Sequence, residues 1–325
     1  MRVLVTGGSG FIGTNLVDHY ARSGADVLNL DTAPPRNAAH RGFWTKVDIC
    51  EREALQRAVA AFAPEVVLHM AARTDLDGRS IDDYPANTLG ISNLIAALRS
   101  SGAARLVIFA STMLVCKIGY RPKSEDDYCP STAYGESKIE GELRVRREAA
   151  GAFPWVILRP TSIWGPWFGP PYRDFFTAVQ NGWYVHPRKQ RIRRNYGFIL
   201  NSVHQIDRLV AAGGADLVGR TVYLADYQPI ELKAWADSIQ RHLGSRPVRE
   251  LPLPLFRLAA RGGDLLLKLG VPRVPISSFR LNNLLTETLH DTTPLEGVVG
   301  PLPYDMEHAV AATCDWLRSP EAANT

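Results

Sequence analysis

The stretch Val3-Leu-Val-Thr-Gly-Gly-Ser-Gly-Phe-Ile-Gly13 decides the fold expected for this chain of 325 residues. Its first residues form a short apolar strand, its glycines form a loop, and its end opens a helical pattern. Gly7 and Gly10 permit a tight turn and a close approach of the backbone to a pyrophosphate, and Gly13 permits close packing of the helix on the sheet. Backbone N–H groups at the helix start then face the anion. This arrangement predicts a loop that binds a dinucleotide.

Four further apolar runs, at 26–30, 65–69, 105–109 and 155–158, alternate with helical patterns after this loop. The runs are mostly continuous, as expected for parallel strands that crossover helices bury on both faces. We therefore expect an α/β fold with a Rossmann-type, doubly wound parallel sheet.

A change of composition after Arg159 indicates a second lobe. The stretch Trp164-Gly-Pro-Trp-Phe-Gly-Pro-Pro-Tyr172 interrupts the alternation of strands and helices. Its aromatic side chains either pack between the lobes, which we favour, or line an apolar substrate site; they are Trp164, Trp167, Phe168 and Tyr172. A further strand is expected at about 218–224. The expected ranges are 1–165, rejoined at about 198–225, for the Rossmann domain, and 166–197 with 226–325 for a smaller, mainly helical C-terminal substrate lobe.

Composition narrows the class of protein. With 46% hydrophobic and 22% charged residues, the chain is typical of a soluble globular protein, and it lacks a run of about 18 apolar residues that would indicate a membrane span. The first residues form a strand and not a secretory signal. The cysteines lack the spacing of a zinc site or a disulfide framework; they are Cys50, Cys116, Cys129 and Cys314. We therefore expect a cytoplasmic protein with no bound metal and no membrane partner.

A basic stretch from His186 to Arg194 contains five Lys and Arg residues in a chain whose formal net charge is only +4. The stretch either binds an anionic ligand or forms a solvated loop. It is accompanied by neither a nucleic-acid-binding module nor a broader basic face. We therefore expect a small-molecule substrate and no nucleic acid partner.

Asp31 ends the second expected strand, eighteen residues after Gly13. A carboxylate at this place accepts hydrogen bonds from the adenosine ribose hydroxyls and repels a 2′-phosphate, so NAD is the expected cofactor. Arg36 and Arg41 leave NADP as the alternative, because a nearby arginine could accommodate that phosphate.

The motif Tyr134-Gly-Glu-Ser-Lys138 places a tyrosine and a lysine four residues apart, on one face of an expected helix. A free phenol has a pKa of about 10, so acid or base chemistry near neutrality needs a neighbouring cation that favours phenolate. Lys138 is expected to supply that cation. Such a pair also occurs on surface helices, but the preceding Ser111-Thr112 and the glycine loop favour the catalytic interpretation.

Together these motifs resemble the extended short-chain dehydrogenase/reductases, in particular the UDP-glucose 4-epimerase-like NAD-dependent epimerase/dehydratase family. Matching motifs extend from Arg2 to about Ser202, with a weaker similarity near 291–317. The resemblance implies that Phe11 and Ile12 lie along the pyrophosphate and that Asp48 and Ile49 meet the adenine. It also implies that Asn87 braces the active-site backbone. The residues that would line the cofactor are Met70, Ala71, Ala72, Thr74 and Pro160. Met70, Ala71 and Ala72 could instead be core residues, and Asn87 a helix cap. His69 is expected to be a core histidine.

The same resemblance implies a catalytic trio of Thr112, Tyr134 and Lys138, with Ser111 as the alternative to Thr112. The hydroxyl of Thr112 would bind the reacting oxygen of the substrate. Dehydratases of the family place an Asp-Glu pair directly after this threonine, whereas this chain has Met113-Leu114, so elimination of water is not expected.

The resemblance also gives candidates for substrate binding. Ser162 stands where nucleotide-sugar enzymes often have an asparagine that helps to hold the substrate diphosphate. Arg194 resembles the arginine that grips the same diphosphate, and Arg280 is a second candidate. Cys116-Lys117 replaces a position where glycine is common, so the rim of the active site is expected to differ from that of the best-known epimerases.

The resemblance implies an NAD-dependent epimerase that acts at C4 of a nucleotide-diphosphate sugar through a transient keto intermediate. In this hypothesis Tyr134 phenolate removes a hydroxyl proton while NAD takes hydride from the same carbon. The alternative is an NAD(P)-dependent dehydrogenase or reductase of a sugar nucleotide or other secondary alcohol. A non-catalytic dinucleotide-sensing protein is the third hypothesis. The resemblance further implies a homodimer through helices over 87–98 and 134–146.

Overall fold

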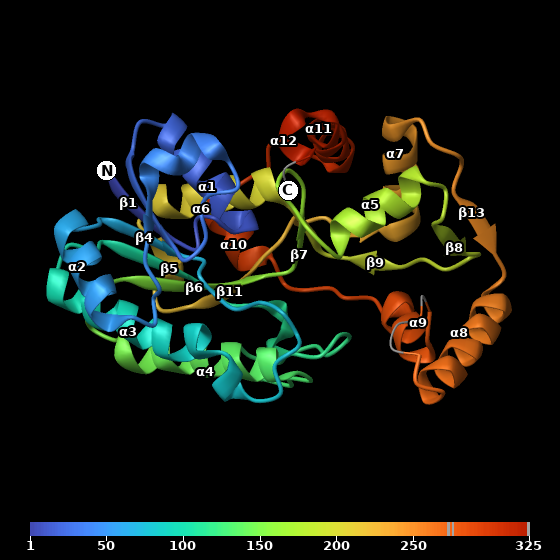
Figure 1. Ribbon diagram of the computed structural model, residues 1–325, viewed down its shortest axis with the longest axis horizontal. Coiled ribbons are helices and arrows are strands. Elements are labelled where there is room, and N and C mark those ends of the chain that lie inside the picture. Colours follow the sequence, from blue (N-terminus) through green and yellow to red (C-terminus); the bar gives the residue numbers. More distant parts are fainter. Residues whose placement is uncertain (272–273, 275, 324–325) are drawn as a thin grey trace.

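Seven parallel strands form the central sheet in the computed structural model, which describes residues 1–271, 274 and 276–323 (Figure 1). Their order is β11-β6-β5-β4-β1-β2-β3. The strands are β1 (Arg2–Thr6), β2 (Asp26–Asp31), β3 (Trp44–Lys46), β4 (Val66–His69), β5 (Leu106–Ala110), β6 (Trp155–Pro160) and β11 (Thr221–Leu224). The strand order reverses between β1 and β4, where doubly wound sheets bind their ligands at the carboxyl ends of the strands. The expected Rossmann-type fold is confirmed.

Helices cover both faces of this sheet (Figure 1). One face carries α2 (Arg52–Phe62), α3 (Pro85–Ser101) and α4 (Ala133–Glu148), and the other carries α1 (Phe11–Arg22), α6 (Ile199–Ala211) and α10 (Thr293–Val299). Alternate residues of β1 point to opposite faces of the sheet. Val3 and Val5 belong to the core beneath α1, and Leu4 belongs to the core beneath α2. Burial on both faces explains why the strands are continuous apolar runs in the sequence.

The structure differs from the sequence-based expectation at the edge of the sheet. All five strands expected in the first 160 residues are present with small shifts of their ends, and β11 lies within the expected range 218–224. The short strand β3 was not predicted. Two of its three residues, Thr45 and Lys46, are exposed, so this edge strand has no apolar run that would indicate it.

Outside the main sheet, aromatic side chains form the core of the second lobe. Trp235 stacks on Phe175 with 4.8 Å between ring centroids, and it lies 4.7 Å from Tyr196 and 5.1 Å from Trp164. The elements of this region are β7 (Ser162–Trp164), α5 (Tyr172–Gln180), β8 (Val185–Pro187), β9 (Arg193–Arg194), β10 (Tyr196–Phe198), β12 (Ile230–Glu231), α7 (Leu232–Leu243), β13 (Arg249–Leu251), α8 (Leu253–Lys268) and α9 (Ser278–Leu285). The strands pair as β7 with β10, β9 with β12 and β8 with β13. The described part of the chain also contains the short 3-10 helices η1 (Ala38–Phe43), η2 (Ile81–Asp83), η3 (Met113–Val115) and η4 (Ala215–Leu217).

The C-terminal helices contact both lobes. After α10 packs against α6, α11 (Met306–Arg318) packs against α7, and α12 (Pro320–Ala323) follows. The ring of Trp316 lies 5.8 Å from Trp167 and 6.0 Å from Phe168. Helix α10, which lies within the expected substrate lobe over 226–325, therefore packs on the Rossmann domain.

Three further observations concern only the residues that the structure describes. No helix among them is long and apolar enough to cross a membrane. They contain no group of three or more His, Cys, Asp or Glu side chains that could hold a metal ion. All four cysteines are free thiols.

Candidate active site

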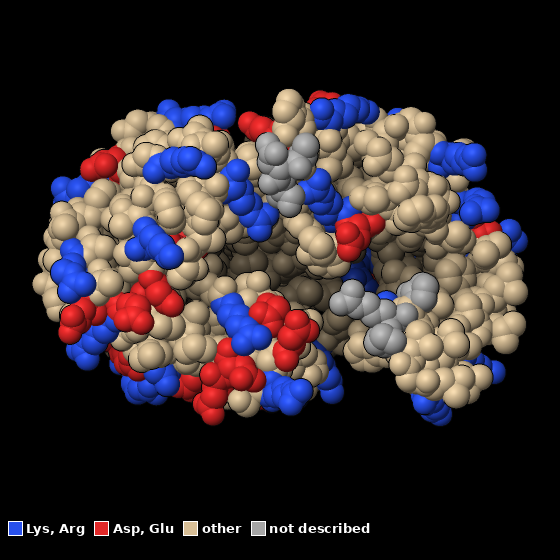
Figure 2. All heavy atoms as spheres, in the orientation of Figure 1, with Lys and Arg blue, Asp and Glu red and all other residues tan. Residues whose placement is uncertain are grey.

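A cavity of about 1110 Å³ lies at the carboxyl ends of the central strands, and Figure 2 shows the molecule hollowed between its two lobes. The three expected catalytic residues and nearly all expected cofactor residues line this one cavity. They are Gly7, Gly10, Phe11, Ile12, Gly13, Asp31, Asp48, Ile49, Met70, Ala71, Ala72, Thr74, Ser111, Thr112, Tyr134, Lys138 and Pro160. Asn87 is the exception among the cofactor residues, and it lies behind the wall.

The glycine loop is shaped by close contacts at two of its glycines. Gly7 has φ +72°, and a Cβ there would lie 2.5 Å from the backbone nitrogen of Ala71. A Cβ on Gly13 would lie 2.1 Å from the carbonyl oxygen of Gly7. At Gly10 the nearest atom to a Cβ is that same oxygen, at 3.2 Å. The loop is therefore tightly packed against the protein at Gly7 and Gly13, and Gly10 presents its bare backbone to the cavity.

The helix that follows this loop, α1, suits an anion at its N-terminus. Its first turn contains no acidic side chain, and its N-cap residue, Gly10, has no side chain to cap the free N–H groups. These N–H groups therefore remain available to a phosphate, and the helix dipole favours negative charge there. The residues present fit the pyrophosphate of a dinucleotide.

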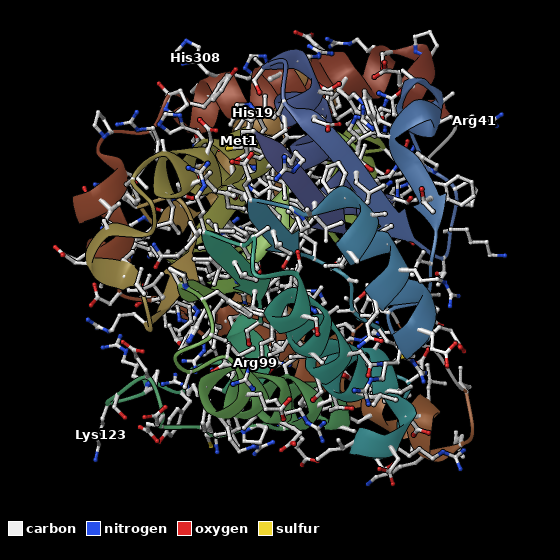
Figure 3. All side chains as sticks on the ribbon, turned by 90° about the vertical axis from the view of Figure 1, so that its left-hand side faces the viewer. Met1, His19, Arg41, Arg99, Lys123 and His308 are labelled. Atoms are coloured by element: carbon white, nitrogen blue, oxygen red, sulfur yellow. The ribbon has the colours of Figure 1, made fainter. Side chains whose placement is uncertain are left out.

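The adenosine end of the cavity contains one carboxylate and one arginine. Asp31 ends β2, and its two oxygens accept hydrogen bonds from the backbone N–H groups of Ser9 and Ala33, each at 3.0 Å. Arg36 lines the same cavity and donates to the carbonyl oxygen of Trp167 at 2.9 Å. Arg41 is exposed, does not line the cavity and points outward from the molecular edge in Figure 3. Of the two arginines that favour NADP, only Arg36 lies near the site.

Tyr134 and Thr112 meet on the cavity wall. Tyr134 lies in the first turn of α4, whose start is fixed by Thr132, because the Thr132 hydroxyl accepts a hydrogen bond from the N–H of Gly135 at 3.0 Å. Burial raises the pKa of the Tyr134 phenol, while a side-chain hydrogen bond with Thr112 acts in the opposite direction. The hydrogen bond with Thr112 therefore lowers the phenol pKa against the effect of burial. The expected role of Lys138 as a cation that favours phenolate stays a prediction.

Lys138 lies one turn further along α4, with a nearly fully buried side chain. Its ammonium donates to the carbonyl oxygen of Ala110, at the end of β5, over 2.6 Å. Burial lowers the pKa of Lys138 to about 8, and the charge of Glu142 acts in the opposite direction. Lys138 therefore loses its charge at a lower pH than an exposed lysine does.

A buried ion pair lies directly behind these residues and was not predicted. The carboxylate of Glu142 accepts hydrogen bonds from Arg159 at 2.7 and 2.8 Å, with both side chains at most 2% exposed. The same carboxylate accepts from the hydroxyls of Ser111 at 2.5 Å and Tyr128 at 2.9 Å. The Ser111 hydroxyl thus points toward Glu142, which leaves Thr112 as the hydroxyl beside Tyr134.

Asn87 connects the loop after β4 to α4, the helix that contains Tyr134 and Lys138. Its side chain accepts from the N–H of Arg73 at 2.9 Å and donates to the Arg73 carbonyl at 3.0 Å and to Ser137 at 2.9 Å. Ser137 lies between Tyr134 and Lys138 on α4. Asn87 therefore holds two walls of the cavity together, in keeping with the bracing role that the resemblance implied.

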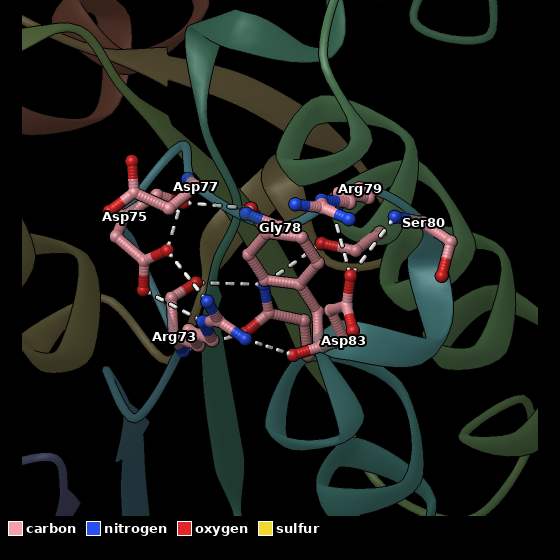
Figure 4. Close-up of polar contacts among 10 residues, drawn as sticks. Arg73, Asp75, Asp77, Gly78, Arg79, Ser80 and Asp83 are labelled. Carbon is pink, nitrogen blue, oxygen red and sulfur yellow. Dashed lines mark hydrogen bonds and ion pairs between the residues drawn. The ribbon is translucent and has the colours of Figure 1, made fainter.

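The loop that Asn87 holds is ordered by Arg73, as Figure 4 shows. Arg73 donates to both carboxylate oxygens of Asp75 at 2.7 and 2.9 Å and to the carbonyl oxygen of Asp83 at 2.7 Å. Its guanidinium lies 4.9 Å from the ring centroid of Tyr84, and the Tyr84 ring lies 6.0 Å from that of Tyr134. Arg73 and Tyr84 thus support Tyr134 from one side, and neither residue was predicted from the sequence.

His69 is a core residue, as expected, but only one of its two ring nitrogens has a hydrogen-bond partner among the described residues. Its Nδ1 lies 2.7 Å from the Thr6 hydroxyl, whereas its buried Nε2 has no hydrogen-bond partner among the described residues. Burial, with the nearby charge of Lys138, lowers the pKa of His69 to about 3. The ring is therefore neutral throughout the ordinary pH range.

The three substrate residues expected to lie beside a diphosphate do not line the cavity. Ser162 is buried in β7, where it bonds to the side chain of Tyr172. Arg194 donates to the carbonyl oxygens of Asn283 and Leu284 at the end of α9. Arg280 donates to the carbonyl of Val274 at 2.6 Å. Both guanidinium groups are thus bonded to backbone carbonyls, which a single sequence cannot reveal.

The part of the cavity wall that comes from residues 163–172 is apolar and aromatic. Its lining includes Ile163, Phe168, Pro170, Pro171 and Tyr172. Trp164 and Trp167 are buried and do not line the cavity, in agreement with the expectation that these aromatic side chains pack between the lobes. Phe168 and Tyr172 also line the cavity, so packing alone does not describe them.

Comparison with known proteins identifies relatives of two chemical kinds. The model of the NAD dependent epimerase/dehydratase family matches residues 3–181. A 3 beta-hydroxysteroid dehydrogenase/Delta 5-->4-isomerase of Mycobacterium tuberculosis is 29% identical over 290 residues, which cover 80% of this chain and 75% of the relative. An N-acetyl-alpha-D-glucosaminyl-diphospho-ditrans,octacis-undecaprenol 4-epimerase of Escherichia coli O157:H7 is 24% identical over 324 residues, which cover 97% and 94%. A UDP-glucose 4-epimerase of Thermotoga maritima, solved with UDP-glucose, shares the fold with a TM-score of 0.75, 19% identity and coverage of 98% and 99%.

Proposed function

The chain belongs to the NAD dependent epimerase/dehydratase family, and on that premise we propose that it is an NAD-dependent epimerase acting at C4 of a nucleotide-diphosphate sugar. The observation that carries the proposal is the meeting of Thr112, Tyr134 and Lys138 on one wall of the cavity that also contains the glycine loop. The E. coli relative that matches 97% of this chain, second lobe included, is named as a 4-epimerase.

The side chains divide the chemistry among them. Thr112 binds the reacting oxygen of the substrate, and Tyr134 takes the proton from that hydroxyl and later returns it. Lys138 keeps positive charge at the end of β5, next to the site of proton transfer. When bound, NAD supplies the hydride acceptor and donor, held by Gly10, the start of α1 and Asp31. An epimerase regenerates its NAD in each turnover, so no second substrate is needed.

Cofactor-free turnover tests this proposal. The purified protein is incubated with UDP, dTDP and GDP sugars without added NAD, and the sugars are separated by chromatography, while mass spectrometry of the denatured protein identifies any retained dinucleotide. Interconversion of two sugars that differ at C4, with retained NAD, is the expected result. A protein that changes no sugar and that accumulates NADH when given NAD and an alcohol contradicts the epimerase proposal.

A second candidate function is an NAD(P)-dependent dehydrogenase or reductase of another secondary alcohol. Two observations favour it. Phe168 and Tyr172 form an apolar part of the cavity wall, and Arg194 is bonded to the end of α9 and does not line the cavity. A 3 beta-hydroxysteroid dehydrogenase is also among the relatives. Stoichiometric NADH formation with a hydroxysteroid, measured at 340 nm, distinguishes this reaction from epimerisation.

We also propose a cytoplasmic homodimer formed through α3 and α4. Each helix presents an exposed leucine, Leu89 at 47% and Leu143 at 41% exposure. Burial of these leucines against a second copy would remove apolar surface from water. Sedimentation velocity of Leu89→Glu is expected to show a monomer where the unaltered protein sediments as a dimer. A dimer that is unchanged by this substitution contradicts the assignment of the interface.

A further inference from the structure

Helix α8 presents a stripe of leucines to solvent at the outer edge of the second lobe (Figure 1). Most of the exposed leucines recur at helical spacing and share one face: Leu255 at 49%, Leu258 at 67%, Leu265 at 58%, Leu266 at 45% and Leu269, at the C-cap, at 71% exposure. Leu267, at 43% exposure, lies outside this face. Gly262 and Ala259 are exposed between them. The face is thus apolar along the whole helix.

The opposite face of α8 is fixed to the protein, so the helix cannot turn to bury the leucines. Ala260 and Gly263 are buried, and a Cβ on Gly263 would lie 1.9 Å from the carbonyl oxygen of Ile276. The carboxylate of Asp264 accepts a hydrogen bond from the N–H of Ser278, the first residue of α9, at 2.9 Å. The leucine stripe therefore remains outward as long as α8 and α9 stay packed.

One flank of the stripe is basic. Arg257, Arg261 and Lys268 are all exposed, and their spacing places them along one side of the helix next to the leucines. The acidic residue of α8, Asp264, is already bonded to α9. Figure 2 shows this corner of the molecule as a largely uncharged surface with Lys and Arg at its edge.

We propose that α8 lies in the surface of a membrane that contains anionic lipid, with its leucines among the acyl chains and its three cations at the head groups. A helix with an apolar face and a basic flank binds such a surface through buried apolar area and electrostatic attraction. A second copy of this chain fits the stripe less well, because leucine-to-leucine contact would bring two sets of cations together without acidic partners on α8.

The proposed membrane contact lies at the substrate lobe. Arg194 bonds to the carbonyls at the end of α9, and its charge acts on Tyr172, which lines the cavity. The expectation of no membrane partner rested on the absence of a spanning stretch, and a helix that lies in the surface needs none. The inference holds for either candidate reaction.

Vesicle co-sedimentation tests the proposal. The full-length protein is mixed with vesicles of phosphatidylcholine alone or of phosphatidylcholine and phosphatidylglycerol in equal parts, at low and high salt. We expect binding to the anionic vesicles that weakens with salt. The double variant Leu258→Glu/Leu265→Glu is expected to lose about tenfold or more in binding. The double variant Arg257→Gln/Arg261→Gln is expected to lose about tenfold or more on anionic vesicles only, since anionic lipid attracts cations near its surface.

Leu76→Glu is the matched control, because Leu76 is 56% exposed and lies in a loop away from α8. It is expected to bind vesicles like the unaltered protein, and circular dichroism of all variants is expected to be unchanged. Failure of the unaltered protein to bind anionic vesicles would overturn the proposal, as would equal binding by the leucine variant. Conversion of a dimer to a monomer by Leu258→Glu/Leu265→Glu, without vesicle binding by the unaltered protein, would assign the stripe to a contact between copies instead.

Discussion

At the scale of single residues, Tyr134 carries the proposed proton transfer. Replacement by Phe keeps the ring and removes the hydroxyl, so the expected result is a fall in kcat of about 10² to 10⁴-fold, the usual contribution of a positioned acid or base. The control is Tyr120→Phe, because the Tyr120 hydroxyl donates to Asp127 at 2.8 Å and does not line the cavity. Equal rates for Tyr134→Phe and the unaltered protein would revive the hypothesis of a non-catalytic dinucleotide sensor.

The lowered pKa of Lys138 predicts the pH at which activity is lost on the alkaline side. Burial lowers its pKa to about 8, so the proposed reaction is expected to slow as the pH rises through about 8 and the ammonium is lost. The arginine variant Lys138→Arg keeps its charge to a much higher pH, so its residual activity should show no loss near pH 8. The measurement is kcat against pH for both proteins. An identical alkaline limb in both would assign that limb to another group.

At the scale of elements, the pair Glu142–Arg159 joins helix α4 to strand β6. Removing one partner leaves a buried charge without compensation, so Glu142→Gln is expected to lower the free energy of unfolding by about 3 to 5 kcal/mol in urea denaturation. The double variant Glu142→Gln/Arg159→Met is expected to cost less than the sum of the single changes. The exposed pair Arg193–Glu287 provides the comparison, because solvent screens exposed charges and Glu287→Gln should change the free energy of unfolding far less.

The same pair makes a second, functional prediction for Glu142→Gln. The charge of Glu142 raises the pKa of Lys138 against the effect of burial. Its removal is therefore expected to move the alkaline limb of kcat to lower pH in the folded variant. A limb that does not move would restrict Glu142 to a structural role.

At the scale of the whole molecule, Asp226 links the two lobes. Its raised pKa predicts that the stability of the fold depends on pH. Its carboxylate accepts from Asn201 of α6 at 3.1 Å and from the N–H of Phe198 of β10 at 3.2 Å. Burial raises the pKa of Asp226 to about 7. Between about pH 4 and 7 the folded protein therefore binds a proton that the unfolded chain has released, and stability from this group falls as pH rises, by up to about 1.4 kcal/mol per unit.

The variant Asp226→Asn isolates this contribution. The difference in unfolding free energy between the unaltered protein and the variant is expected to shift in favour of the variant from pH 5 to pH 8, measured by urea denaturation. Below about pH 4 the group is protonated in both states and contributes no slope. If the difference in unfolding free energy between the two proteins stays constant from pH 5 to pH 8, Asp226 does not titrate near pH 7.

The sequence by itself determined the Rossmann domain and the cofactor half of the cavity. These features depend on local rules: glycines where a Cβ would collide, as at Gly7 and Gly13, apolar runs for strands buried on both faces, and a tyrosine and lysine one helical turn apart. A further signal was available, because Glu142 follows Lys138 by four residues on the same helix face. A charged residue in that place, with Arg159 at the end of an apolar strand, indicates a buried pair.

Only the tertiary structure decided the substrate half of the site and the surface of α8. Whether Arg194 faces the cavity or the carbonyls of α9 depends on how segments about ninety residues apart pack together, and no local pattern encodes that distance. The leucines of α8 have the same spacing whether a neighbouring element covers them or not. Their exposure follows from the packing of Gly263 against Ile276, which fixes the opposite face and turns the leucines toward solvent.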